Sequence, residues 1–437
     1  MVVRSRLTSL ETAFLAMEQP GLPMNVSAVL VLEPGPRLTL EKLRQAISPR
    51  LRRLPRFHQK LAGGPWTLNR PHWEPVPRIN LARHLFRHTL PAPGSRAQLD
   101  AMCAQIQEQA LSREKPLWEI HLIDGQRDGQ CIVVKMHHAI TDGIAGVAIA
   151  QRLFDGEAGR RAEADRQLPG FADSMRPSLL TAAQTMLGIA ATAASGPIAL
   201  AGPFNGHVGP RRSFATTTIP LDLIRLAKQR DGGTVDDVFV AIVASGLRDY
   251  LAGVAYPGVP HALRAMLPVS TRTAGGDGLG NHVTAVFLDL PMMPLEFGAL
   301  VRAIATSKSD LRAAHAATGA IAAVRAAGLL PNPLHSAVVH IASATRCCNL
   351  VLSDVPAPGM SLSLLGRRVS VSYPVMPLGA SIGLSIAALG SDGQLGVGIT
   401  ADPEIVPDVH RIAVAIHHVV VDLDHALRHR AHAPRAA

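Results

Sequence analysis

The chain has 437 residues, of which 47% are hydrophobic and 17% charged, and its formal net charge is +10. This composition excludes a disordered chain and fits a globular protein of two or three domains. The positive charge suits an anionic partner such as nucleic acid, anionic lipid or an anionic cofactor. The sequence has no block of like charges and no nucleic-acid-binding motif, so we expect no nucleic acid partner.

In chain order, the first part alternates helical and strand-like patterns. We expect helices at 7–18, 39–54, 95–112 and 144–154, and strands at 25–33, 117–123 and 131–136. Ser95 is the predicted cap of its helix. The Pro-rich segment 59–94 is predicted to be irregular, and 155–177 reads as a loop.

An Ala-rich stretch at 178–203 comes next. It is about as long as a membrane span, but it is weakly hydrophobic and broken by Gly196 and Pro197. We expect a helix that packs on or links two domains, and contact with a membrane surface is the alternative.

The second part begins with a predicted strand at 211–220. Helices are predicted at 220–232, 234–253, 296–328 and 406–428, and strands with turns at 263–272, 278–292, 347–359, 368–375, 381–390 and 394–402. We therefore predict an α/β fold with two mixed-sheet halves, 1–177 and 211–437, joined by a crossover at 178–210.

The four cysteines, at 103, 131, 347 and 348, show no metal-ligand spacing. The N-terminus lacks the pattern of a signal peptide. We expect a cytoplasmic protein with reduced cysteines and with no metal or permanently bound cofactor.

The sequence HHAITDG (137–143) falls at a predicted strand-to-helix junction. A histidine there can point into a cleft, and Asp142 and Gly143 lead into the helix. Such an imidazole could deprotonate a hydroxyl or thiol that attacks an ester or thioester. The structural alternative is a core histidine pair followed by an aspartate that only caps the helix.

A second copy of the spacing, HHVVVD (417–422), lies inside a predicted helix that Asp408 caps. His418 and Asp422 share a face and could form a solvated ion pair. Leu423 stands where the first copy has its glycine. We interpret this copy as structural.

The chain resembles the bacterial wax ester synthase/diacylglycerol acyltransferase family of the coenzyme A-dependent acyltransferase superfamily, nearly from end to end. The blocks that carry the resemblance include, in order, LTSLETAFLAMEQPGLPMNV, PRFHQKL, KPLWEIHLIDG, HHAITDG, TVDDV, LPVSTR, GLGNHV, LVLSDVPAPG and ADPEIVPDV. The resemblance implies two similar halves with a tunnel between them. Acyl-coenzyme A would reach the tunnel from one side and the acceptor alcohol from the other.

The resemblance also implies roles for the motif. His138 would be the general base, and His137 would support it. Asp142 would brace the loop, through an arginine, and Gly143 would permit the turn.

Further site residues are implied by other matching blocks. Asn281 and Ser270 would donate to the oxyanion, Arg272 would pair with Asp142 or a coenzyme A phosphate, and Trp118 would line the tunnel. The alternatives are turn chemistry for Asn281 and Ser270, a surface arginine and a core tryptophan.

Two positions depart from the family pattern. Asp236 precedes Asp237 where the family has Asn-Asp, and Asp354 begins DVPAPG where the family has Asn-Val-Pro-Gly-Pro. Each departure puts a carboxylate where an amide is usual. These changes could weaken activity or alter the acceptor.

The function implied is transfer of a long-chain acyl group from acyl-coenzyme A, as co-substrate, to diacylglycerol or to a long-chain alcohol. The protein could work at a membrane or lipid-droplet surface. One alternative is a condensation-type transferase that takes acyl groups from a carrier protein. The other is a non-catalytic or weakly active lipid-surface protein.

Overall fold

The first part of the chain folds into alternating helices and strands, as predicted. The computed structural model describes residues 4–127, 129–157, 201–270, 281, 283–313, 327–355 and 361–430. The elements up to residue 157 are β1 (Ser5–Arg6), α1 (Ser9–Met17), β2 (Asn25–Leu32), α2 (Leu40–Arg50), η1 (Leu51–Arg53), η2 (Pro55–His58), β3 (Gln59–Ala62), β4 (His72–Pro75), η3 (Leu81–Arg83), β5 (Leu85–Thr89), α3 (Arg96–Glu108), β6 (Trp118–Gln126), β7 (Gly129–His137), α4 (Gly143–Leu153) and β8 (Asp155–Glu157).

The second part supplies the remaining elements. They are β9 (Ser213–Pro220), α6 (Leu221–Asp231), α7 (Val235–Gly253), β10 (Ala262–Ser270), β11 (Val283–Pro291), α8 (Phe297–Ala313), α10 (Asn332–Ala344), β12 (Leu350–Val355), β13 (Ser361–Leu364), β14 (Arg367–Val375), β15 (Leu384–Ser391), β16 (Gln394–Ala401) and α11 (Val409–Arg430). The predicted capping positions are confirmed. Ser95 accepts a hydrogen bond from the Gln98 N–H, and Asp408 accepts one from the His410 N–H.

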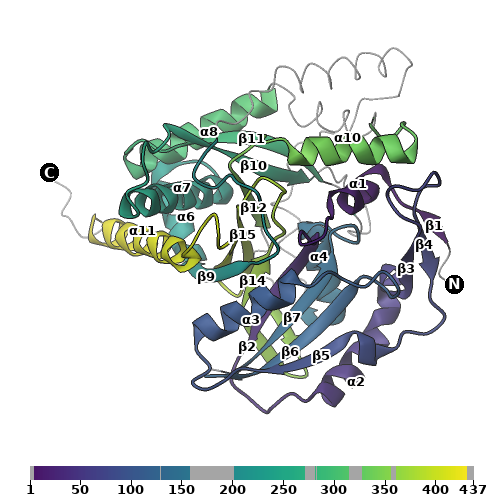
Figure 1. Cartoon of the computed structure of the whole chain (residues 1–437). Coiled ribbons are helices and arrows are strands. Elements are labelled where there is room, and N and C mark those ends of the chain that lie inside the picture. Colours follow the sequence, from purple (N-terminus) through teal and green to yellow (C-terminus); the bar gives the residue numbers. More distant parts are fainter. Residues whose placement is uncertain are drawn as a thin grey trace.

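Two large mixed sheets form the body of the protein (Figure 1). Within the described residues, one sheet has the order β5-β6-β7-β2-β14-β13-β8 and the other β11-β10-β12-β15-β16-β9. Both contain parallel and antiparallel neighbours, so the predicted mixed α/β class is confirmed. A small sheet, β1-β4-β3, lies beside the first.

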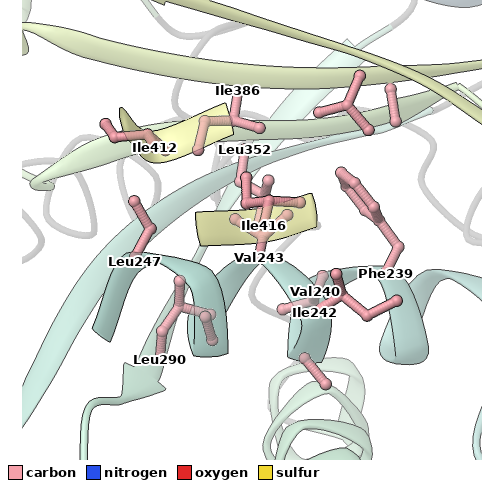
Figure 2. Close-up of a cluster of buried hydrophobic side chains, with 14 of the residues drawn as sticks. Phe239, Val240, Ile242, Val243, Leu247, Leu290, Leu352, Ile386, Ile412 and Ile416 are labelled. Atoms are coloured by element: carbon pink, nitrogen blue, oxygen red, sulfur yellow. The ribbon is translucent and has the colours of Figure 1, made fainter. Parts of the chain in front are cut away.

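Helices cover these sheets and bury separate hydrophobic clusters against them. α1, α2 and α4 pack on one face of the first sheet, while α3 packs on its other face and reaches β9. α7 and α11 cover the second sheet. Figure 2 shows Val243 of α7 and Ile416 of α11 meeting Leu352 and Ile386 of the strands. Aliphatic side chains dominate this core, in keeping with an aromatic content of 4%.

One hairpin crosses between the halves. β13 and β14 come from the second half of the sequence, yet β14 pairs with β2 in the first sheet. The predicted boundaries at 177 and 211 therefore do not separate the two sheets, because the first sheet contains strands from both sides of these boundaries.

The backbone of β14 also lies directly against β16. A methyl group at Gly398 would overlap the carbonyl oxygen of Pro374, and one at Gly396 would overlap that of Ser372. Only glycine allows two strands to approach this closely. This contact fixes the first sheet, through β14, directly against the second sheet, through β16.

Some predicted elements differ from the structure. The segment 59–94 is predicted to be irregular but contains β3, β4 and β5. Strands of four or five residues show too few alternations to be recognised between prolines. α10 was not predicted. The predicted helix at 296–328 corresponds to α8 as far as Ala313, and its continuation at 314–326 lies outside the described residues.

Most of the Ala-rich stretch, 178–200, also lies outside the described residues. Among the helices that the structure does describe, none has the length and apolarity needed to cross a bilayer.

The second histidine motif lies on α11, as predicted. His417, His418 and Asp422 are exposed on this helix. The predicted ion pair between His418 and Asp422 is wrong for the described residues, since no such contact joins them.

We expect Gly398→Ala to destabilise the protein by about 3 kcal/mol or more, because the added methyl must force β14 away from β16. Urea unfolding would measure the change. Gly253→Ala is the control: it adds a methyl at the end of α7, where the nearest atom is the tip of Arg411 at 3.6 Å. That variant should be neutral or more stable by up to about 1 kcal/mol. Equal effects of the two substitutions would contradict the close-contact interpretation.

Candidate active site

The first histidine motif lies at a strand-to-helix junction, as the sequence predicts. β7 ends at His137, residues 138–141 form the turn, and Asp142 caps α4 by accepting a hydrogen bond from the Ala145 N–H at 2.9 Å. Gly143 is the first residue of α4, so its backbone is helical. The chain reversal therefore lies before Gly143 and needs no left-handed glycine there.

His138 is held inside this turn and is only 8% exposed. Its backbone N–H donates to the Met24 carbonyl at 2.7 Å, and its ring stacks on Phe14 of α1 with centroids 3.9 Å apart. Burial lowers the pKa of His138 to about 4, although its own carbonyl and the Asp142 charge act in the opposite direction. The imidazole is therefore neutral at pH 7 and can accept a proton.

His137 supports the turn from the other side. Its Nδ1 accepts a hydrogen bond from the Ala139 N–H at 3.0 Å, so its ring proton is on Nε2. That nitrogen lies 3.3 Å from Glu18 Oε1. The contact fixes the tautomer and the orientation of a ring adjacent in sequence to His138.

Glu18 was not anticipated from the sequence. It also receives a hydrogen bond from Arg113 at 2.7 Å. Burial alone would raise the pKa of Glu18, yet His137 and Arg113 together lower it to about 2. A permanent negative charge therefore faces His137. A carboxylate at the last position of the first predicted helix is the only sequence signal for it.

Asn281 reaches the turn from the second half. Its amide nitrogen donates to the carbonyl oxygens of His138 at 2.9 Å and Ala139 at 3.1 Å. An amide group has two donor hydrogens, and both are used here. In this geometry Asn281 braces the turn at His138; the oxyanion contact that the resemblance implied stays a prediction.

The other candidates from the sequence are Ser270, Arg272 and Trp118. Ser270 is half-buried at the end of β10, opposite Val283. Arg272 lies outside the described residues, as does any pairing it makes. Trp118 is fully buried; its indole N–H donates to Phe57 and its ring stacks on His84. It lies opposite Met136 on β7, and so on the other face of the sheet from His137. Trp118 therefore packs the core.

The two positions that depart from the family pattern meet in space. Asp236 and Asp237 lie in the first turn of α7, and both contact the Lys308 ammonium of α8, Asp237 at 2.7 Å. Asp354 lies near the end of β12 beside them. Its burial and the Asp236 charge raise the pKa of Asp354 to about 8, while Lys308 acts to lower it.

This acidic cluster lies at the same end of the second sheet as Asn281, which contacts the turn after β7. β10 and β12 run parallel, so Asp354 lies at the same end of the sheet as Ser270. Ser270 pairs with Val283, two residues beyond Asn281. The two acidic substitutions thus form one protonatable cluster near the second half's contact with the catalytic turn.

Two mixed sheets thus share one hairpin, and a buried, neutral histidine lies between a strand and a helix. The solved wax ester synthase/diacylglycerol acyltransferase from Marinobacter aquaeolei VT8 has the same fold. It matches with a TM-score of 0.71 and 22% identity over 97% of this chain and 100% of that one. The first condensation domain of the calcium-dependent antibiotic synthetase also matches in fold, with a TM-score of 0.64 and 15% identity over 97% and 96%.

The sequence comparisons give the family. The wax ester synthase/diacylglycerol acyltransferase catalytic domain matches residues 7–169, and the C-terminal domain of that family matches 279–423. A Mycobacterium tuberculosis protein described as a diacylglycerol O-acyltransferase is 31% identical, over 93% of this chain and 88% of its own length. The chain belongs to the wax ester synthase/diacylglycerol acyltransferase family, as its sequence blocks indicated.

Because the pKa of His138 is about 4, we expect kcat/KM to stay flat from neutral pH down to about pH 5 and to fall only as pH approaches 4. A solvated histidine would instead lose activity near its ordinary pKa of about 6.5. Phe14→Ala removes the stacked ring and admits water, so its acid limb should move toward higher pH. A wild-type limb near 6.5 that Phe14→Ala leaves unmoved would contradict this expectation.

Asp354 should make stability depend on pH. Its carboxyl keeps its proton up to about pH 8 when folded, compared with 3.8 as the ordinary value, so the folded state holds the extra proton between these limits. Stability must therefore fall as pH rises through that window. Asp354→Asn removes this loss, so its thermal midpoint should exceed that of the wild type by a margin that grows with pH. Asp222→Asn, at an exposed position of α6, should show no growing margin.

Proposed function

We propose that the chain is an O-acyltransferase that moves a long-chain acyl group from acyl-coenzyme A to diacylglycerol, and also to long-chain alcohols. Family membership along most of the chain supports the acyl-transfer chemistry. The description of the M. tuberculosis relative supports diacylglycerol as acceptor. The observation that carries the proposal is the buried, neutral imidazole of His138, braced from both halves of the protein.

In the proposed reaction, His138 takes the proton of the acceptor hydroxyl as its oxygen attacks the thioester carbonyl. The new carbon–oxygen bond forms a tetrahedral intermediate, and its collapse breaks the carbon–sulfur bond. The imidazolium then returns its proton to the departing coenzyme A thiolate. The negative charge of Asp142 favours the protonated ring, so it stabilises the charge that His138 acquires.

The remaining groups position this base. Met24 holds the backbone of His138, Asn281 holds two carbonyls of the turn, and Glu18 orients His137. Acyl-coenzyme A is a co-substrate in this scheme, and no metal or permanently bound cofactor has a role. The proposed location is the cytoplasm, at the surface of a membrane or lipid droplet. The lipid surface is part of the proposal because diacylglycerol and triacylglycerol partition out of water.

The test incubates purified protein with labelled palmitoyl-coenzyme A and either diacylglycerol or hexadecanol, and measures neutral-lipid product. His138→Ala should lower kcat by about 10² to 10⁴, the usual contribution of a positioned base. His418→Ala is a matched control, because it removes a histidine of the second motif from an exposed site on α11.

Three outcomes would contradict the proposal. They are the absence of any lipid product, full activity in His138→Ala, and equal losses in the two variants. A carrier-protein donor is the alternative chemistry, and a higher kcat/KM with acyl carrier protein than with acyl-coenzyme A would favour it.

A further inference from the structure

The amphipathic character of α10 is reversed relative to an ordinary surface helix. Its polar residues Asn332, His335 and Ser336 are at most 2% exposed. Its apolar residues Leu334, Val338 and Ile341 are 56%, 40% and 67% exposed. They are spaced by four and three positions, so they share one face. Among the described residues no side chain covers this outward-pointing apolar stripe, and such a stripe marks an interaction surface.

The buried polar face of α10 fixes this orientation. Asn332 donates to the carbonyls of Pro65 at 2.9 Å and Thr67 at 2.7 Å, and the Ser336 hydroxyl donates to Pro65 at 2.5 Å. Rotating the helix to bury its leucine, valine and isoleucine would break all three bonds. The outward apolar face is therefore held by specific contacts.

The loop that accepts these bonds extends the apolar surface. Trp66 and Leu68 are 54% and 88% exposed, and the Trp66 ring meets His340 of α10 edge-on. Leu329, just before α10, is 77% exposed. We call these exposed side chains the α10 patch: Trp66, Leu68, Leu329, Leu334, Val338 and Ile341.

Charge around the α10 patch favours an anionic surface. Residues 327–346 contain no aspartate or glutamate, and exposed Arg346 ends the segment. Arg70, which follows the loop, donates to the Gly328 carbonyl and adds a second positive charge. Apolar side chains with a tryptophan, next to two arginines and on a helical segment without acids, suit the headgroup region of an anionic bilayer.

The α10 patch is also connected to the active site. α10 packs on α1, and Phe14 of α1 stacks on His138. Figure 1 shows α10 beside α1, at the opposite end of the molecule from the C-terminal part of α11. A surface bound at α10 would therefore lie next to the helix that covers the catalytic base.

We propose that the α10 patch seats the protein on an anionic lipid surface, from which the acceptor lipid is drawn. This inference rests on the proposed function for the identity of the acceptor, but the binding itself can be measured without any substrate.

The test is flotation of the purified protein with vesicles of phosphatidylcholine and phosphatidylglycerol. The triple variant Leu334→Ser, Val338→Ser, Ile341→Ser should bind on the order of 10- to 100-fold more weakly, because three apolar side chains no longer leave water. The matched control is Val414→Ser, Val421→Ser on α11, where both valines are 51% exposed. The control should float like the wild type, and added salt should weaken binding of both.

Turnover supplies a second readout. The triple variant should keep wild-type kcat with a water-soluble short-chain alcohol and lose activity on diacylglycerol in vesicles through a higher KM. This split would not arise from a misfolded protein.

Several results would overturn the inference: equal flotation of wild type and triple variant, equal loss in the α11 control, or a wild-type dimer that the triple variant turns into a monomer in light scattering. The last would mean that a second copy covers the α10 patch. If the protein floats with vesicles but shows no turnover, the proposed acyltransferase function is contradicted and lipid binding at the α10 patch stands. If the protein is active but does not float, lipid binding is contradicted and the proposed function stands.

Discussion

The backbone contact between β14 and β16 is the constraint on which the arrangement of this protein depends. Gly396 and Gly398 leave no side chain between the two strands, so the sheets approach to the limit set by their backbones. β14 also pairs with β2, and β2 pairs with β7, the strand that ends at the catalytic turn. The position of the active-site histidine relative to the second half is therefore set through three adjacent strands.

Within this fixed geometry, the turn after β7 keeps the neutral imidazole of His138 out of water. Burial against Phe14 lowers the basicity of His138, while Asp142 nearby favours the charged form. The backbone of the turn is held by Met24 from its own half and by Asn281 from the other. The copy of the motif on α11 has the same spacing but is exposed. Its histidines lack both the burial and the braces.

Much of the fold and the strand-to-helix position of the histidine motif could be predicted from the sequence. The strand before His137, the cap at Asp142 and the order of the family blocks are local patterns. Other features depend on contacts between distant segments. The family resemblance made Asn281 an oxyanion candidate, and its contacts with the turn were not predictable because the two acceptors lie more than 140 positions away. The partnership of Glu18 with His137 and the meeting of Asp236 with Asp354 have no local signature. Trp118 was placed in a tunnel, although its N–H bonds Phe57 in the core.

The bond from Asn281 to the catalytic turn has a consequence for the protein during its own synthesis. The ribosome delivers the complete His-His motif long before it delivers Asn281. A first half that folds early therefore carries a base whose turn lacks its brace, and it also lacks β14 as a partner for β2. The first sheet can be complete only after residue 375 has been made, because β14 is one of its strands.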